Sequence, residues 1–485
     1  MTFTRPLSPS SSPIHASVLD CQSDRPRFSR DLLTGCNELS YFLPSRADGV
    51  NDMYLHLGFQ APPELISPQR VHAIWAVQRL RHPLLASGLM PRHEALRLAA
   101  EESSLTSSSK DDLLSNYLNG PRLLSAWRTS FLIVARDPER KDEWHLVLCA
   151  MHCIGDGLEL DKQNGLPQSM EAALPALPSG LRRAIGMVDD QLLSTKQIRH
   201  IVMVDIREDS LSPRAYEKIL ACCKANGVSV SSAVFALCNI AWAKLLARGV
   251  VTAEMGPNCQ RESQNYSALK KEALMPTRLM YSALNTRPWL DQISANESFF
   301  RLNIGYFNIV ASIHRTFWHR ARLAKAQSAA AVKSQFIISR TQLTASKRKE
   351  QAIKWAKIDD GEAARTRTGL LTPATTPIKE QPPALPNVEP RASRSNPTPP
   401  STALMGLSLL GNLDGMYTHA AYGPIKLDTL TTGSRQRAGA MLLFSYTFVG
   451  KLWLCFGYDE NGFDRAVVEE FWKEVVGGVD EMIGT

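Results

Sequence analysis

A histidine, an aspartate and two glycines stand close together at the end of an apolar stretch, where residues 152–157 are HCIGDG. A neutral imidazole, with an ordinary pKa of about 6.5, can take a proton from a hydroxyl or an amine at physiological pH. A general base of this kind contributes about 100-fold to 10,000-fold to the rate of attack on a carbonyl. His152 is therefore a candidate general base, and the reaction needs no covalent enzyme intermediate.

The spacing of His152 and Asp156 is a weak indication by itself. A chain of this length shows such a pair by chance about 0.5 times at average composition. Gly157 lowers that chance about tenfold, and the position at the end of a predicted strand would hold the base in place. A histidine that merely closes a strand is the alternative interpretation.

Motifs of several other chemistries are missing from the sequence. It contains neither a Gly-x-Ser-x-Gly nucleophile elbow nor a phosphate-binding loop. The nine cysteines form no CxxC pair and no zinc spacing, so we expect reduced thiols and no metal site. The net charge is +8, but the basic residues are scattered, which argues against nucleic acid as a partner.

Two predicted strands position the histidine. Apolar segments at 129–135 and 144–152 flank a charged turn at 137–142, a pattern typical of an antiparallel pair. Gly155 and Gly157 then allow the chain to turn away from the sheet. Upstream, the apolar spacing of residues 69–86 predicts a helix that ends at His82-Pro83 and packs its apolar face on a sheet.

A second series of elements follows from about residue 195. We predict strands at 198–204, 278–285, 303–313 and 404–410, helices at 213–224, 231–248, 318–336 and 464–482, and a hairpin of strands 440–448 and 451–458. The length suits two domains. The prediction is an α/β protein with lobes at 1–194 and 195–485, interrupted by a flexible Pro-rich insertion at about 358–402.

The segment around His152 and four further blocks, in order along the chain, resemble the coenzyme-A-dependent acyltransferase superfamily and its HxxxDG signature. That superfamily includes chloramphenicol acetyltransferase, plant and carnitine acyltransferases and the condensation domains of peptide synthetases. The overall pattern is most similar to fungal alcohol acetyltransferase-like and condensation-like proteins. The four blocks are Trp75–Ser87, Ser282–Leu290, Leu407–Tyr417 and Tyr446–Leu452.

The resemblance implies two lobes of mixed β-sheet flanked by helices, with an active-site tunnel between them. It also implies acyl-CoA, with acetyl-CoA as the first choice, as a co-substrate and no bound cofactor. The acceptor would be a hydroxyl of a small hydrophobic molecule of secondary metabolism. His152 would take the hydroxyl proton and later pass it to the departing thiolate.

Further residues are assigned by the same resemblance. Asp156 is similar to a structural aspartate that points away from the base and pairs with an arginine. Arg287 is the matching candidate, and an exposed charge at a strand end is the alternative for it. Gly157 completes the motif. Asn285, Ser408 and Thr447 stand near predicted strand ends, where each could contact substrate or donate to the oxyanion of the tetrahedral intermediate, although a structural role is the alternative for each.

Two departures from the family leave the acyl donor open. Met151 stands where condensation domains carry an additional histidine, and the Asp-Phe-Gly-Trp-Gly block of plant members is absent. A condensation-like domain that forms an amide or ester from a carrier-protein thioester is therefore one alternative. A catalytically inactive binding homologue is another, which the intact motif disfavours.

We expect a cytoplasmic monomer without a membrane span. The N-terminal segment lacks a basic and then apolar signal pattern, and no stretch of about 18 apolar residues without charges occurs.

Overall fold

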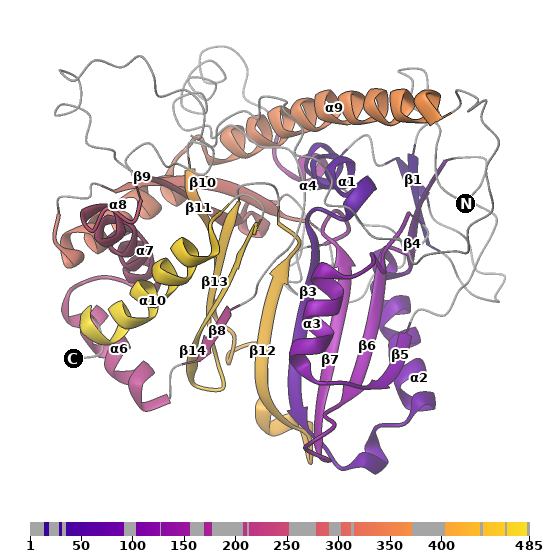
Figure 1. The fold of residues 1–485 in the computed structure, drawn as a ribbon, viewed down its shortest axis with the longest axis horizontal. Helices are drawn as coiled ribbons and strands as arrows, with labels where there is room; N and C mark the ends of the chain where they lie inside the picture. The colour runs from indigo at the N-terminus through magenta and orange to yellow at the C-terminus, as the bar shows by residue number, and fades with distance from the viewer. Residues whose placement is uncertain are drawn as a thin grey trace, which may run out of the picture.

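Two large β-sheets, each with its own helices, and a small third sheet form the structure, a computed structural model (Figure 1). It describes residues 14–18, 29–31, 35–91, 103–126, 128–155, 169–176, 207–210, 213–251, 278–290, 302–311, 315–370, 403–436, 440–460 and 463–482. The predicted α/β class, with two mixed sheets flanked by helices, is confirmed.

The first sheet has five strands in the order β12-β3-β7-β6-β5. They are β3 (Asp52–Gln60), β5 (Ser103–Ser107), β6 (Ser130–Arg136), β7 (Glu143–Met151) and β12 (Lys426–Ser434). β6 and β7 form the predicted antiparallel pair, and β7 also pairs antiparallel with β3. Buried and half-buried residues alternate over most of β3, as expected for a sheet whose two faces differ.

The second sheet has six strands in the order β10-β9-β11-β13-β14-β8. They are β8 (Arg207–Ser210), β9 (Arg278–Asn285), β10 (Ile304–Ala311), β11 (Ala403–Asn412), β13 (Met441–Phe448) and β14 (Lys451–Tyr458). β11 runs parallel to both of its neighbours, whereas the other pairs are antiparallel. The predicted hairpin of β13 and β14 turns at Val449 and Gly450, which both have positive φ. A third, small sheet joins β2 (Ser29–Asp31), β1 (Ile14–Val18) and β4 (Ser87–Pro91).

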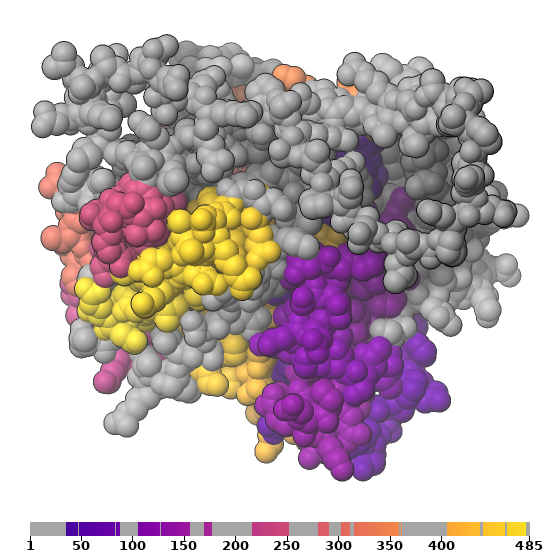
Figure 2. All heavy atoms as spheres, viewed as in Figure 1, coloured from indigo at the N-terminus to yellow at the C-terminus, as the bar shows by residue number. Residues whose placement is uncertain are grey.

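The helices cover these sheets and bridge them. They are α1 (Cys36–Asp48), α2 (Pro68–Arg81), α3 (Lys110–Asn119), α4 (Met170–Ala173), α6 (Pro213–Ala225), α7 (Val230–Ala247), α8 (Phe317–Lys333), α9 (Ile337–Leu370) and α10 (Arg465–Met482), with 3-10 turns η2 (Pro63–Leu65), η3 (Pro83–Ala86), η5 (Arg287–Trp289) and η6 (His419–Tyr422). α9 runs along the top of both halves and packs on α1 (Figure 1). In the space-filling view, yellow C-terminal residues and purple residues of the first half occupy opposite sides of the same face (Figure 2).

Helix α7 forms the centre of the second half. Ser229 caps it, because its hydroxyl accepts from the backbone N–H of Ser232 at 3.1 Å, as its position before the helix predicts. Its length and apolar composition would suit a membrane span, and among the described residues no other helix passes this test. However, 61% of α7 is buried inside the protein, and it packs on α8 and α10 as a core helix.

Strand β12 connects the two halves. It lies late in the chain but pairs with β3 of the first sheet, with Thr431 opposite His56. The hydroxyl of Tyr446 in β13 donates to the carbonyl of Leu430 in β12 at 2.6 Å, which joins the strand to the second sheet as well. The division at residues 194 and 195 stays a prediction, since 177–206 lie outside the described residues, as does the predicted strand at 198–204. The crossing of β12 was not predicted.

The helix predicted to end at His82-Pro83 does so, since α2 ends at Arg81 and His82 is its C-cap. The expectation that its apolar face packs on a sheet is corrected: α2 buries Val71 and Trp75 only, and Ile74, Val77 and Leu80 are 60%, 45% and 55% exposed. The start predicted for the Pro-rich insertion, at about residue 358, is too early, because α9 continues to Leu370. Residues 358–370 include no proline and several good helix formers, which favours the longer helix. Residues 371–402 lie outside the described part of the chain.

Candidate active site

The end of β7 places His152. Met151 is the last residue of the strand, and its backbone N–H donates to the carbonyl of Thr129 at 2.8 Å. The chain then turns immediately, with the N–H of Ile154 donating to the carbonyl of Met151 at 3.1 Å. Cys153, Ile154 and Gly155 are buried, whereas the histidine between them and the strand is half-buried. The imidazole therefore stands on a turn that is fixed on both sides.

A hydrogen bond determines which ring nitrogen of His152 is basic. Nδ1 lies 3.0 Å from the carbonyl oxygen of Gly155. A carbonyl only accepts, so Nδ1 carries the hydrogen, and the lone pair of the neutral ring is on Nε2. If Nε2 takes a proton, the same carbonyl stabilises the positive charge at Nδ1. The arrangement suits a general base that acts through Nε2.

A buried ion pair supports the strand end that carries His152. Asp52, 1% exposed, is the first residue of β3 and lies opposite Met151 in the sheet. Its carboxylate accepts two hydrogen bonds from Arg122, at 2.6 Å and 3.0 Å. Burial raises the pKa of Asp52, and the charge and hydrogen bonds of Arg122 oppose that rise. Gly49, at φ +73°, makes room, because a Cβ there would clash with the Asp52 carboxylate and lie 2.8 Å from Nε of Arg122.

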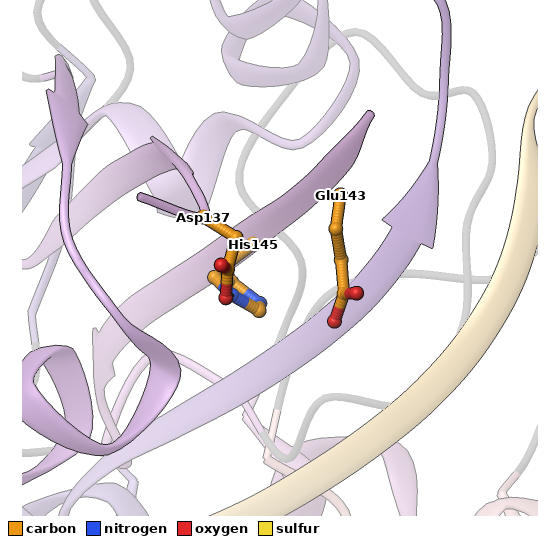
Figure 3. Close-up of side chains that lie close together, drawn as sticks. All are labelled: Asp137, Glu143 and His145. Carbon is orange, nitrogen blue, oxygen red and sulfur yellow. The ribbon is translucent and has the colours of Figure 1, made fainter. Parts of the chain in front are cut away.

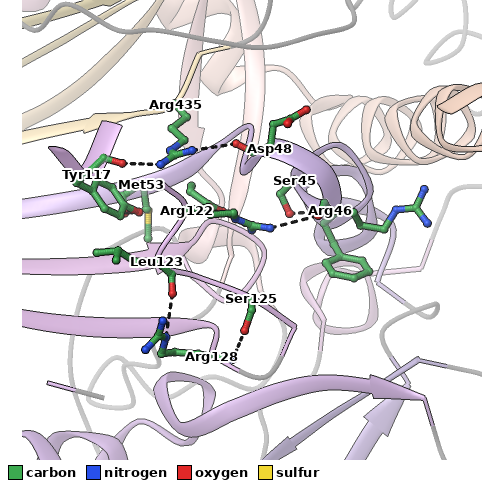
Figure 4. A network of polar contacts seen from close by, with 12 residues as sticks. Ser45, Arg46, Asp48, Met53, Tyr117, Arg122, Leu123, Ser125, Arg128 and Arg435 are labelled. Atoms are coloured by element: carbon green, nitrogen blue, oxygen red, sulfur yellow. Dashed lines mark hydrogen bonds and ion pairs between the residues drawn. The ribbon is translucent and has the colours of Figure 1, made fainter. Parts of the chain in front are cut away.

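A second arginine ties the crossing strand to the same region. Arg435, just after β12, donates to the carbonyls of Asp48 at 3.1 Å, Tyr117 at 2.7 Å and Gly120 at 3.0 Å. These carbonyls belong to the C-terminal ends of α1 and α3, where a cation is favourable. Figure 4 shows Arg435 between Asp48 and Tyr117, with Arg122 reaching the carbonyl of Arg46. The network fixes α1 and α3 against the first sheet.

An aromatic cluster lies against the imidazole. The ring of Tyr41 in α1 is 4.4 Å from that of His152, centroid to centroid, at an interplanar angle of 38°. The Tyr41 hydroxyl is hydrogen-bonded to the hydroxyl of Tyr306 in β10. The guanidinium of Arg348 in α9 lies over both tyrosine rings, 4.6 Å from the centroid of Tyr41 and 4.5 Å from that of Tyr306.

The cysteines on either side of the base are inert in this structure. Cys149 and Cys153 are buried, and burial raises the pKa of both thiols well above the ordinary value. A thiol is nucleophilic as the thiolate, so neither cysteine competes with His152 for a chemical role at neutral pH. They act as small buried residues.

The other predicted site residues are only partly described. Asp156 and Gly157 lie outside the described residues, so the pairing of Asp156 with Arg287 stays a prediction. Arg287 is half-buried at the start of η5, and the carboxamide oxygen of Asn285 accepts from its backbone N–H at 3.0 Å. Asn285 therefore closes the turn after β9.

Ser408 and Thr447 both lie in the second sheet. Ser408 is half-buried in β11 opposite Phe444, and Thr447 is buried in β13 opposite Asn412. Thr447 is the last residue but one of β13 and so stands near a strand end, as predicted, whereas Ser408 lies in the middle of β11 and not near its end. A contact of either residue with substrate or oxyanion stays a prediction.

Figure 3 shows the one group in the described part of the chain whose carboxylates and imidazole could together hold a metal ion, Asp137, Glu143 and His145. It lies where β7 begins, at the opposite end of the strand from His152. Arg140 already provides a cation there, 2.6 Å from Glu143 and 3.8 Å from Asp137. His145 Nε2 is 3.3 Å from the Asp137 carboxylate. Arg140 thus offsets one of the two carboxylate charges, and these contacts give the cluster a structural role.

Comparison with solved structures identifies the fold. The chain is similar to trichothecene 15-O-acetyltransferase TRI3 from Fusarium sporotrichioides, with a TM-score of 0.60 and 11% identity over 99% of each chain. It is also similar to SgcC5 from Streptomyces globisporus, with a TM-score of 0.50 and 11% identity over 92% of this chain and 98% of that one. The X-domain from teicoplanin biosynthesis has a TM-score of 0.50 and 10% identity over 96% and 97%.

These similarities are confined to structure. No family model matches the sequence, and no similar sequence was found among curated proteins. At 10% to 11% identity the shared property is the fold, which is the two-lobed α/β fold that the sequence predicts. The activity must be argued from the site of this chain.

Sequence reasoning did not find Tyr41, Tyr306 or Arg348. They stand far apart in the chain, and nothing in their spacing connects them. Arg348 lies in the basic run Lys347–Lys349, which is typical of a solvated helix face, yet it is buried. The tertiary packing of α9 on α1 produces the cluster.

Proposed function

We propose that this protein is an acyltransferase that moves an acyl group, with acetyl as the first choice, from coenzyme A to a hydroxyl of a small hydrophobic acceptor. The observation that carries the proposal is the hydrogen bond from Nδ1 of His152 to the Gly155 carbonyl, because it makes Nε2 the basic nitrogen. The fold shared with a known O-acetyltransferase over the whole chain supports it. We place the reaction in the cytoplasm and in secondary metabolism.

The chemistry follows from the position of one base. The acceptor hydroxyl gives its proton to Nε2 of His152 as its oxygen attacks the thioester carbonyl. The resulting tetrahedral intermediate carries a negative oxygen, for which Ser408, Asn285 and Thr447 are candidate donors. When the carbon–sulfur bond breaks, the thiolate takes the proton back from His152. The products are the ester and free coenzyme A, and the base returns to its starting state.

A base of this kind contributes roughly 100-fold to 10,000-fold to the rate when it is held in position. Several contacts hold His152 in this structure. The turn after β7, the Asp52–Arg122 ion pair and the aromatic cluster all restrict His152 or the strand that carries it. We assign Asp156, with Arg287 and Gly157, to the same supporting role and not to proton transfer.

Thiol release from acetyl-CoA, followed in the presence of a panel of alcohols and amines, tests the proposal. Transfer to an alcohol that depends on His152 supports it. The same panel with an acyl group loaded on a carrier protein tests the condensation-like alternative, in which only the carrier-bound acyl group is used. If neither donor reacts but acceptors bind, the chain is an inactive binding homologue.

A further inference from the structure

The hydrogen bond to Gly155 restrains one atom of the His152 ring. The last side-chain torsion of histidine is broad, since it joins tetrahedral and planar carbons. The 3.0 Å contact of Nδ1 with the Gly155 carbonyl restrains the position of one ring atom. The tilt of the ring about that contact decides where Nε2 points, and a second contact, on the face of the ring, restricts that tilt.

Tyr41 provides that second contact. Its ring lies 4.4 Å from the imidazole at 38°, within the range of packed aromatic pairs. Tyr41 is itself buried in α1, and a rotation of the His152 ring toward it would produce a clash. The tyrosine can limit the tilt of the imidazole only as far as its own ring is held still.

Two residues hold the ring of Tyr41. The hydroxyl of Tyr306 is hydrogen-bonded to the Tyr41 hydroxyl, and Arg348 lies over both rings at about the same distance. A cation over an aromatic face is attracted by the negative charge of that face, most strongly when water is excluded. Arg348 is 8% exposed, so the attraction acts in a largely water-free site. Burial raises the pKa of Tyr306, which keeps its hydroxyl protonated and able to hydrogen-bond.

The residues of this cluster come from both halves of the chain. His152 and Tyr41 precede residue 195, whereas Tyr306 in β10 and Arg348 in α9 follow it. α9 packs along α1 and against β10, which brings the two pairs together. The orientation of the base thus depends on packing between the halves.

We propose that Tyr41, held by Tyr306 and Arg348, is a positioning residue that fixes the imidazole of His152, so that the second half of the chain aligns the base carried by the first. Tyr41 acts through His152 and takes no part in proton transfer. The kinetic consequence rests on the proposed function, but the structural consequence does not.

The structural consequence is tested by nitrogen-15 NMR of protein labelled at its eleven histidines. The His152 signals are assigned by their loss in His152→Gln, and spectra are recorded at pH 8, where an ordinary imidazole is neutral. The wild type should show Nδ1 protonated and Nε2 unprotonated. Tyr41→Leu should mix the two tautomers and bring the two nitrogen shifts together, and Tyr306→Phe should do so partially.

The kinetic consequence is tested with the same variants under saturating acyl donor and acceptor. Tyr41→Leu should lower kcat about tenfold to 100-fold with little change in KM, as expected when a reacting group is misplaced by about 1 Å. Tyr41→Phe and Tyr306→Phe each remove the same hydroxyl pair, so the double variant should be no slower than the slower single variant. Tyr458→Leu, which truncates a buried tyrosine of the second-half core, is the control for general loss of packing and should leave kcat and the His152 signals unchanged.

The two tests separate the inference from the proposed function. Unchanged His152 signals and unchanged kcat in a folded Tyr41→Leu protein would overturn the positioning role. Altered tautomer signals in a protein without acyl transfer would leave the positioning role intact and remove the proposed function.

Discussion

At the scale of single residues, the site depends on a few side chains whose environments exclude other roles. His152 is half-buried, with its Nδ1 hydrogen committed to the Gly155 carbonyl, whereas His145 and His56 are buried and hydrogen-bonded to each other at 3.2 Å. Only the first of these three stands on a turn at a strand end. Position and exposure, not residue type, distinguish the proposed base from the two buried histidines.

Gly49 provides a residue-scale prediction. Alanine at φ +73° costs about 1–2 kcal/mol from backbone strain alone. Its Cβ would also clash with the Asp52–Arg122 pair, and overpacking of this kind costs about 1–3 kcal/mol more. Gly49→Ala should therefore lower the free energy of unfolding in urea by more than Gly227→Ala, which has φ +69° and no atom within 4 Å of the added Cβ. Equal losses in the two variants would show that the ion pair yields without cost.

At the scale of elements, the crossing strand β12 is held by a chain of buried hydrogen bonds. The hydroxyl of Thr431 lies 3.1 Å from Nδ1 of His56, whose Nε2 lies 3.2 Å from Nδ1 of His145. Nε2 of His145 faces the carboxylate of Asp137 at 3.3 Å. Because the carboxylate accepts, each imidazole can be neutral and donate once, so the hydroxyl of Thr431 completes the series as donor. Protonation of His56 would place a positive charge in a fully buried site beside a second imidazole, and the hydroxyl of Thr431 would have to turn from donor to acceptor.

This series of buried hydrogen bonds predicts that the folded protein loses stability in acid. Burial, followed by the neighbouring His145, holds the pKa of His56 well below its ordinary 6.5 in the folded state. The unfolded chain therefore binds more protons below pH 6.5, and stability falls as the pH drops through that range, by at most about 1.4 kcal/mol per pH unit for one group. Urea unfolding at pH 7.5, 6.5 and 5.5 measures the slope.

The contribution of His56 is the difference between the wild type and His56→Gln. We expect the variant to be less stable at pH 7.5 and to lose less stability between pH 6.5 and 5.5. His72→Gln, on the exposed face of α2, is the control and should keep the wild-type slope. The same slope in all three proteins would contradict a neutral His56.

At the scale of the whole molecule, the two halves of the fold were predicted from the sequence. The contacts that connect the halves were not. The strands around His152 were predictable because each is a local apolar run with a charged turn between them. β12 was not, since its sequence KLDTLTTGS has polar residues on both faces and gains its place only by pairing with β3. The cluster of Tyr41, Tyr306 and Arg348 was beyond sequence reasoning for the same reason, because only long-range packing assembles it.

The corrected end of α9 changes what can be removed from the chain. Replacing residues 371–401 with a short Gly/Ser linker should leave the melting temperature nearly unchanged, since loop-closure cost varies slowly with length. Replacing residues 352–401 in the same way should clearly lower the melting temperature, because this change removes Ala352 and Ala356, which are buried in the first core. Calorimetry of both proteins gives the comparison, and a large loss in the shorter replacement would show that the Pro-rich stretch contributes to the fold.

The proposed pair of Asp156 and Arg287 would be a second link between the halves. If the pair is buried, removing either partner should cost about 3–5 kcal/mol, because a charge is left alone. In a double-mutant cycle of Asp156→Ala and Arg287→Ala, the coupling should be about 0.5–3 kcal/mol, as for contacting residues. Asp156→Asn should be milder, since the amide can still accept from the guanidinium. Additive losses in urea unfolding would exclude the pair.

The most direct test of the central claim is the rate of acetyl transfer from acetyl-CoA to an accepted alcohol by His152→Ala, measured beside the wild type at saturating substrates. The claim predicts a folded protein whose kcat is lower by at least about 100-fold, the smaller contribution expected of a general base. His72→Ala is the matched control, because this exposed histidine lies outside the site, and it should retain the wild-type rate. Near-normal turnover by a well-folded His152→Ala protein would contradict the mechanism.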